Sequence, residues 1–193
     1  MAHDLYLSSA SPRRIEILEG HGVPFKKIPN LLIQEPAITE FESPIDYGAR
    51  LALAKVMASK ASFEGLILGV DTIVYKDNTV YGKPHHAEAA IQMLNELSGA
   101  SHRVITTCAL YDSISSQYFF CSDEAIVSLK PYNDSVIKSY VDEFQPFDKA
   151  GGYGIQEDPS FIDSINGDFY TIMGLPINRL LKIFSHYGIV KSC

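Results

Sequence analysis

The chain is poor in cysteine and contains no tryptophan. Its three cysteines, Cys108, Cys121 and Cys193, are widely spaced, and no CxxC pair or Cys/His cluster accompanies them. A disulfide framework or a structural zinc site is therefore not expected. Cys108 and Cys121 lie in apolar runs, which favours core thiols over nucleophiles.

Basic side chains are also scarce, since 16 Lys and Arg face 23 Asp and Glu, for a net charge of −7. An acidic protein binds nucleic acid poorly, because duplex affinity depends on neutralising phosphates. The chain has no apolar run near the ~20 residues that span a bilayer, and no basic N-terminal region followed by a long apolar segment. We expect a cytoplasmic protein without a nucleic-acid or membrane partner. A polyphosphate ligand would require locally concentrated cations and a divalent metal.

What the chain does contain is an alternation of strand-like and helix-like segments. Its 193 residues and 46% hydrophobic content suit one globular domain or two closely joined lobes. The pattern predicts extended segments at residues 5–9, 23–32, 66–75, 80–81, 102–111, 117–129 and 161–165, and helices at 11–21, 43–62, 86–97, 133–144 and 176–187. The segments at 102–111 and 117–129 are expected to form a hairpin. Together these predict an α/β fold with a mixed sheet covered by helices.

Residues 5–14 are the most informative stretch, a short apolar strand followed by hydroxyls, a proline and two arginines. Ser11 and Pro12 predict a helix start, with the Ser11 side chain accepting at the N-cap. Arg13 and Arg14 then lie in the first turn, where cations are disfavoured by the helix dipole. A bound anion with several charges would explain them, since amides, hydroxyls and guanidinium groups together make a phosphate site. The alternative is that both arginines are solvated.

Two acids are candidate metal ligands. Asp71 lies in the most apolar strand, where a carboxylate is costly unless it is paired. It is either a buried cap or ion-pair partner, or a metal ligand or general base. Glu35 precedes Pro36, which keeps it out of the helical region. Across a cleft from Asp71 it would complete an all-oxygen site for Mg²⁺ or Mn²⁺, whereas alone it would simply be solvated. A triad of Ser9 or Ser11 with His102 and Asp71 has no GxSxG elbow to support it.

Lysines and a glycine-rich segment complete the candidate set. Lys83 lies in a rigid kink at a strand end, and Lys55 lies at the margin of the apolar face of the helix at 43–62. Either lysine alone would more often be a surface residue. Residues 149–156 contain three glycines, which allow a ligand to approach the backbone, and Gln156 adds an amide. This segment has neither the P-loop nor the dinucleotide-binding pattern.

At this point the chain resembles the Maf family of nucleoside triphosphate pyrophosphatases. The residues that carry the resemblance occur in family order: 9–14 (S-x-S-P-R-R), Glu35 (I-D-E, with Gln34 in place of Asp), 69–72 (A-D-T), 82–84, 97–99 with His102, 148–156 and 174–176. Residues 106–108, Thr-Thr-Cys, depart from the T-G-V that is common in the family.

The resemblance implies one Maf-like domain over residues 1–193, with a fold like that of inosine triphosphate pyrophosphatases. In such a fold a twisted central sheet is flanked by helices, and two lobes enclose an active-site cleft. The implied reaction cleaves a nucleoside triphosphate to the monophosphate and pyrophosphate with the help of Mg²⁺ or Mn²⁺. The form of residues 153–156 is similar to the group that prefers dTTP and UTP, and modified pyrimidine nucleotides stay open as substrates. A homodimer is open on the same grounds.

The resemblance also assigns roles to residues. Asp71, Glu35 and Lys83 would be catalytic, and Glu35 and Asp71 would bind the metal. Substrate would be held by a wider set: Ser9, Ser11, Arg13, Arg14, Lys55, Lys83 and Gln156. The alternative is a nucleotide-binding regulator of cell division and septum formation that does not cleave its ligand.

Overall fold

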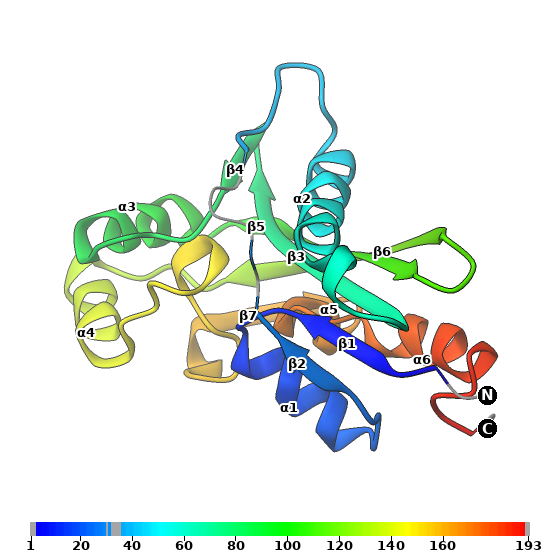
Figure 1. Cartoon of the computed structure of the whole chain (residues 1–193). Helices are drawn as coiled ribbons and strands as arrows, with labels where there is room; N and C mark the ends of the chain where they lie inside the picture. Colours follow the sequence, from blue (N-terminus) through cyan, green and yellow to red (C-terminus); the bar gives the residue numbers. More distant parts are fainter. Residues whose placement is uncertain (1–2, 30, 32–35, 192–193) are drawn as a thin grey trace. The chain divides into compact units, whose positions relative to one another are not determined.

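The computed structural model describes residues 3–29, 31 and 36–191, and within them it contains one seven-stranded sheet with helices around it (Figure 1). The strands are β1 (Leu5–Ser8), β2 (Lys26–Ile28), β3 (Leu66–Lys76), β4 (Thr79–Tyr81), β5 (Ser101–Asp112), β6 (Gln117–Leu129) and β7 (Ile162–Asn166). The α-helices are α1 (Pro12–Gly20), α2 (Pro44–Ser59), α3 (Ala87–Leu97), α4 (Asp134–Phe144), α5 (Phe169–Met173) and α6 (Ile177–His186). Short 3-10 turns are η1 (Lys60–Ser62), η2 (Ala150–Gly152) and η3 (Pro159–Phe161).

The sheet is mixed, in the order β2-β1-β3-β5-β6-β7, with β4 added to β3. β1 runs parallel to both β2 and β3, as expected where a helix connects the strands. β4 is antiparallel to β3, and β7 is antiparallel to β6. The predicted mixed α/β fold is confirmed.

The chain folds into two compact units that are interleaved in sequence. Unit 1 comprises residues 1–71, 106–123 and 174–193, and unit 2 comprises residues 72–105 and 124–173. Strands β3, β5 and β6 each contribute residues to both units.

One buried apolar cluster of unit 1 joins α2 to the strands of the sheet. Ile28, Ala52, Val56, Ile67 and Ala109 form this cluster. Gly69 of β3 allows this packing, because a Cβ there would collide with the backbone carbonyl of Ala52. The close approach of α2 to β3 brings the middle of the helix against the strand that carries Asp71.

Unit 2 has its own core around α3 and α4, which pack against each other. Its large buried members include Val74, Leu94, Leu97, Ile137 and Phe161. The glycine-rich segment lies on this core, since η2 packs against α3. Each unit therefore buries its own apolar cluster, and three strands connect the two.

Some predicted boundaries were wrong. Within the described part of residues 23–32, only Lys26–Ile28 form a strand. The strand predicted at 161–165 begins one residue later, because Pro159–Phe161 form a 3-10 turn. Helix α5 was not predicted, since its five residues are too few to show a helical period.

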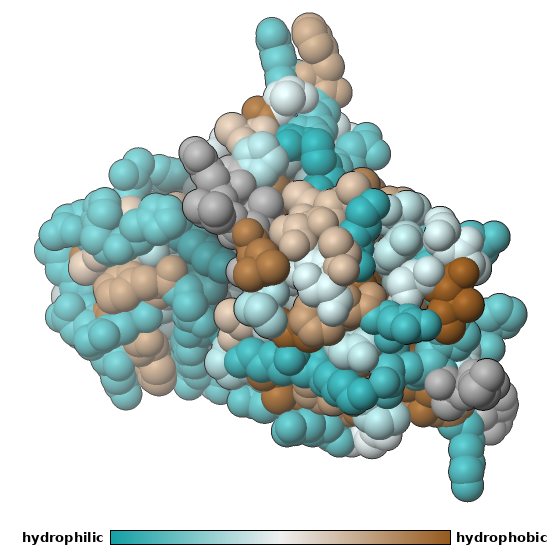
Figure 2. Space-filling model, viewed as in Figure 1, coloured by the Kyte–Doolittle hydropathy of each residue, from teal (hydrophilic) through white to brown (hydrophobic). Residues whose placement is uncertain are grey.

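Hydrophilic and hydrophobic residues are mixed on the surface. On the face drawn in Figure 2, hydrophobic residues form small separate patches among hydrophilic ones. Across the described ranges 3–29, 31 and 36–191, the helices are all too short or too polar to cross a bilayer.

Candidate functional site

The start of α1 in unit 1 brings the predicted serines and arginines together. Arg14 is buried, with 9% of its surface exposed, and its Nη1 donates to Ser9 Oγ at 2.9 Å. Its Nε donates to the carbonyl of Gly174 at 2.8 Å. Ser9 Oγ also accepts from the backbone N–H of Ser11 at 3.2 Å. The Arg14 guanidinium therefore ties the start of α1 to the segment that leads into α6.

The helix start itself differs in one detail from the prediction. Pro12 occupies the first turn and Ser11 the N-cap position, as predicted, but the Ser11 side chain makes no capping hydrogen bond. The first turn contains no acidic residue, so no carboxylate of this turn adds negative charge at the positive end of the helix. Arg13 is half-buried. This end of α1 is suited to an anion.

The second feature of unit 1 is a buried ion pair between α2 and β3. Lys55 Nζ lies 2.5 Å from Asp71 Oδ1, and the two side chains are only 6% and 9% exposed. Lys55 also reaches the Val70 carbonyl at 3.5 Å. A helix with a mostly apolar buried face thus places one ammonium group against the one acid of β3.

This pairing was not predicted, although each residue was singled out. Both charges lie among apolar neighbours in the sequence. Removing one charged group from water without a partner costs a free energy on the order of several kcal/mol. Buried residues of opposite charge are therefore expected to form ion pairs. That argument predicts from the sequence that each charge has a partner, but not which residue the partner is.

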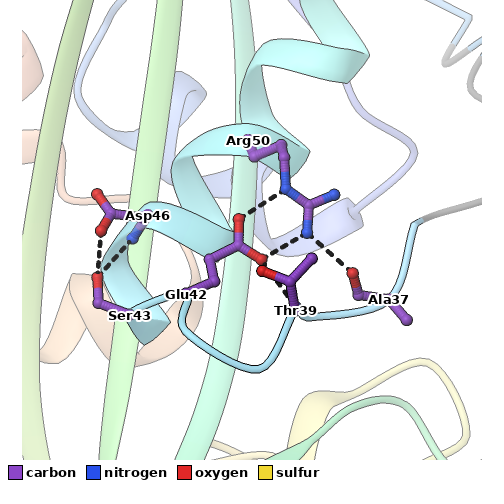
Figure 3. Close-up of polar contacts among 6 residues, drawn as sticks. All are labelled: Ala37, Thr39, Glu42, Ser43, Asp46 and Arg50. Carbon is purple, nitrogen blue, oxygen red and sulfur yellow. Dashed lines mark hydrogen bonds and ion pairs between the residues drawn. The ribbon is translucent and has the colours of Figure 1, made fainter.

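A hydrogen-bonded turn leads into α2 and precedes Lys55 in the chain (Figure 3). Ser43 caps the helix by accepting from the Asp46 N–H at 3.1 Å. The Arg50 guanidinium binds both oxygens of Glu42 at 2.6 Å and the Ala37 carbonyl at 2.9 Å. The hydrogen bond from Arg50 lowers the pKa of Glu42. The segment from residue 37 to the helix is thereby fixed to α2.

The predicted metal pair is described only in part. Glu35 lies outside the described residues, and Asp71 carries the ion pair above. In the part of the chain that the structure describes, no three His, Cys, Asp or Glu side chains form a metal-binding cluster. The pairing of Glu35 with Asp71 therefore stays a prediction.

Lys83 and Gln156 belong to unit 2, unlike the other predicted residues. Lys83 is exposed, between β4 and the buried Pro84. Gln156 is exposed and lies in the wall of a cavity of about 570 Å³, together with apolar side chains from β7 and α5. Ile165 of β7 and Phe169 of α5 are among these neighbours, and Ile155 next to Gln156 also lines the cavity.

The glycines of residues 149–156 have a structural reason within unit 2. Gly151 and Gly152 have φ values of +74° and +73°, which favour glycine. A Cβ at Gly151 would lie 3.1 Å from the Val74 side chain, and the Gly151 N–H donates to the Gly82 carbonyl at 3.0 Å. The backbone of this segment, which was predicted to lie close to a ligand, packs at Gly151 against the core of unit 2.

Lys149 is held in the same segment by carboxylates. Its Nζ lies 2.6 Å from Glu157 Oε1 and 2.7 Å from Asp148 Oδ1. Tyr140 donates its hydroxyl to Glu157 at 3.0 Å and accepts from the Gly154 N–H at 2.9 Å. These bonds close a small network that holds the glycine-rich segment in place.

His102 is not part of a catalytic triad. It is 2% exposed, and its Nε2 lies 2.6 Å from the Tyr153 hydroxyl, within unit 2. Burial, followed by the positive charge of Lys76, lowers the pKa of His102 to about 4. His102 is therefore neutral near pH 7 and supports Tyr153. The hydroxyl of Ser9 and the carboxylate of Asp71 have the partners given above.

Comparisons with known proteins cover nearly the whole chain. Residues 4–187 match the family model described as Maf-like protein. A dTTP/UTP pyrophosphatase of Symbiobacterium thermophilum is 38% identical over 190 residues, which cover 95% of this chain and 94% of the relative. One of Alkaliphilus oremlandii is 39% identical over 189 residues, covering 96% and 97%.

Among solved structures, the Ham1 protein of Staphylococcus aureus aligns with 65% of this chain and 71% of its own. The sequence identity is 13% and the TM-score is 0.42.

Proposed function

Because the chain belongs to the Maf family, we propose that it is a nucleoside triphosphate pyrophosphatase that hydrolyses dTTP and UTP to the monophosphate and pyrophosphate. The observation that carries this proposal is the identity of 38–39% with proteins named dTTP/UTP pyrophosphatase over 95% of the chain or more. The two features of unit 1, the cationic start of α1 and the buried carboxylate of β3, supply chemistry that suits a triphosphate.

Phosphate binding is assigned to the start of α1. The positive end of the helix dipole and the Arg13 side chain favour an anion. Arg14 contributes charge at a fixed position, because its bonds to Ser9 and Gly174 orient the guanidinium. Ser9 and Ser11 are proposed to hydrogen-bond phosphate oxygens.

Asp71 is proposed to accept the proton of the water that attacks the α-phosphorus, with pyrophosphate as the leaving group. Lys55 is proposed to contact phosphate and also to orient the Asp71 carboxylate. Its ammonium group lies against Oδ1 of Asp71, so it fixes the direction in which the carboxylate points. Most of the rate enhancement would come from positioning and from stabilising the charge on the leaving oxygens.

We propose Mg²⁺ or Mn²⁺ as the cofactor, with Asp71 and Glu35 as its protein ligands. Such ions are held through one or two carboxylates together with substrate phosphates, so a larger cluster of protein ligands is not required. Asp71 supplies the carboxylate that this donor set needs. When bound, the ion would neutralise charge on the phosphate oxygens.

Lys83 and Gln156 remain separate predictions, a catalytic cation and a contact to the base. The Gln156 amide could pair with the edge of a pyrimidine, and the apolar neighbours in its cavity suit a flat ring. We also propose a cytoplasmic location, where nucleoside triphosphates are made and used.

The test is a panel of dTTP, UTP, dCTP, CTP, ATP and GTP, each assayed with Mg²⁺, with Mn²⁺ and with EDTA. We expect equal amounts of monophosphate and pyrophosphate, highest turnover with dTTP and UTP, and no turnover in EDTA. Release of orthophosphate would contradict the proposed bond cleavage. Tight nucleotide binding without any cleavage would contradict the enzyme and favour the regulator.

A Gln156→Ala variant separates base recognition from chemistry. If Gln156 contacts the base, the ratio of kcat/KM for dTTP over dCTP falls about tenfold or more, as expected for a lost hydrogen bond to substrate. A ratio that does not change would remove Gln156 from base recognition while leaving the reaction itself untouched.

A further inference from the structure

The two cysteines of the β5–β6 hairpin face each other. A loop of residues 113–116 joins the strands, so Asp112 and Gln117 flank the turn. At the other end, the Ser101 and Ser128 hydroxyls are 2.8 Å apart. Moving the same number of residues along each strand, from 101 to 108 and from 128 to 121, places Cys108 opposite Cys121.

The two thiols also act on each other, because each side chain shifts the pKa of the other within unit 1. Directly opposed residues in an antiparallel pair have Cα atoms about 4.5–5.5 Å apart. A disulfide accepts Cα separations of about 4.4–6.8 Å, a range that includes directly opposed positions on antiparallel strands.

The two thiols differ in environment. Cys108 is fully buried, and burial raises its pKa. Cys121 is half-buried, and its hydrogen bond with Cys108, reinforced by the charge of Arg179, lowers its pKa against the opposing effects of burial and Asp123. Because the thiolate is the reactive form, Cys121 is the nucleophile of the pair. Cys108 is the adjacent thiol that can resolve the first product.

We infer that Cys108 and Cys121 form a redox-modification site that a peroxide converts to a cross-strand disulfide. The Cys121 thiolate attacks one peroxide oxygen, the O–O bond breaks, and the hydroxide that leaves takes a proton to become water. Cys121 is then a sulfenic acid. The Cys108 sulfur attacks the Cys121 sulfur, the S–O bond breaks, and a second water leaves with the thiol proton. Two thiols are oxidised, and one peroxide is reduced to two waters.

The inference does not depend on the proposed function. The sequence pattern predicted unreactive core thiols at both positions. The facing position and the partial exposure of Cys121 instead make the pair reactive.

The experiment uses the full reduced chain, treated with increasing hydrogen peroxide and then mapped by peptide mass spectrometry. The expected product is a peptide pair joined through Cys108 and Cys121, lighter by two hydrogens and restored by dithiothreitol. Both thiols should lose reactivity toward iodoacetamide together. Oxidation confined to Cys193, or conversion of Cys121 to sulfinic acid without a link, would overturn the inference.

A Cys108→Ala variant tests the order of the two thiols, with circular dichroism as the check that it folds. Without the resolving thiol, Cys121 should stop as a sulfenic acid and be trapped by dimedone, at least tenfold more than in the unaltered chain. Equal dimedone labelling of both proteins would mean that Cys108 does not resolve the intermediate, and would overturn the mechanism. Peptide mapping of the unaltered chain tests the disulfide independently, whether or not this variant folds.

Discussion

Each unit buries a lysine against a carboxylate, but the two pairs are used differently. In unit 1, Lys55 lies 2.5 Å from Asp71, and the side chains are 6% and 9% exposed. In unit 2, Lys149 lies 2.6 Å from Glu157, and the exposures are 10% and 21%. The two distances are nearly equal, and the carboxylate of unit 2 is the more exposed of the two.

The difference lies in what else the carboxylate holds. Glu157 accepts from the Tyr140 hydroxyl, which also accepts from the Gly154 N–H, so this pair supports the glycine-rich segment. Asp71 lies in the middle of a regular strand whose backbone is held by the sheet. Glu157 therefore has a structural role in unit 2, whereas the role that we propose for Asp71 is catalytic.

The largest expected effect concerns the stability of the two pairs. Lys55→Met should lower the free energy of unfolding by about 3–5 kcal/mol, because Asp71 stays buried without its ammonium partner. Lys149→Met should cost about 1–3 kcal/mol, since its partners are more exposed. Urea unfolding at neutral pH measures both.

The double variant Lys55→Met/Asp71→Asn is the matched control. It removes both charges, so it should recover part of the stability that Lys55→Met loses. Equal losses for the two lysine variants, or no recovery in the double variant, would show that the pairs are equivalent.

Next in size is the effect of Asp71→Asn on turnover. Loss of the proposed base and metal ligand should lower kcat with dTTP by roughly 10²-fold or more, while the side chain keeps its shape. Asp112→Asn is the control, because Asp112 is equally buried in unit 1 and instead holds the 113–116 turn through Ile114 N and Ser115. A kcat for Asp71→Asn within threefold or so of the starting protein would exclude Asp71 from the chemistry.

A pH effect is expected from unit 2. His102 has its pKa lowered to about 4, whereas in the unfolded chain it titrates near 6.5. Between these values the unfolded chain binds the extra proton, so stability rises with pH. The contribution of His102 is complete above about pH 6.5 and decreases as the pH falls toward about 4.

The measurement compares the starting protein with His102→Gln, which cannot titrate. From about pH 7.5 to about pH 5 the starting protein should lose about 2 kcal/mol more than the variant. The remaining histidines are common to both proteins, so their effects cancel. Identical pH profiles would show that His102 is not held neutral by the fold.

The smallest expected effect compares two glycines with positive φ. Gly151→Ala in unit 2 should cost about 1–2 kcal/mol or more, because backbone strain adds to the contact of the new Cβ with Val74 at 3.1 Å. Gly22→Ala in unit 1 has a φ of +63° but open space around it, so about 1 kcal/mol is expected from strain alone. Thermal unfolding distinguishes the two, and a larger loss for Gly22→Ala would contradict the packing argument.

The sequence predicted the helices well where amphipathic periodicity is long. The segments at 86–97 and 133–144 became α3 and α4 almost to the residue, with His86 and Asn133 as N-caps. It made β2 too long and missed α5, and these elements have three and five residues. Such short elements are selected by neighbouring strands and packing, not by local pattern.

The candidate residues follow the same division. The sequence alone determined the types of candidate residue and the family that they resemble. These residues are two first-turn arginines after Ser-Pro, an acid in an apolar strand and a lysine on an apolar helix face. These follow from local chemistry, because a charge among apolar residues and a cation at a helix N-terminus each need compensation. Only the tertiary structure decided which groups compensate one another: Lys55 with Asp71, Arg14 with Gly174, Lys149 with Glu157 and Cys108 with Cys121. The members of each pair lie on different segments of the chain, and their approach is set by the packing of the sheet and helices, which no local window contains.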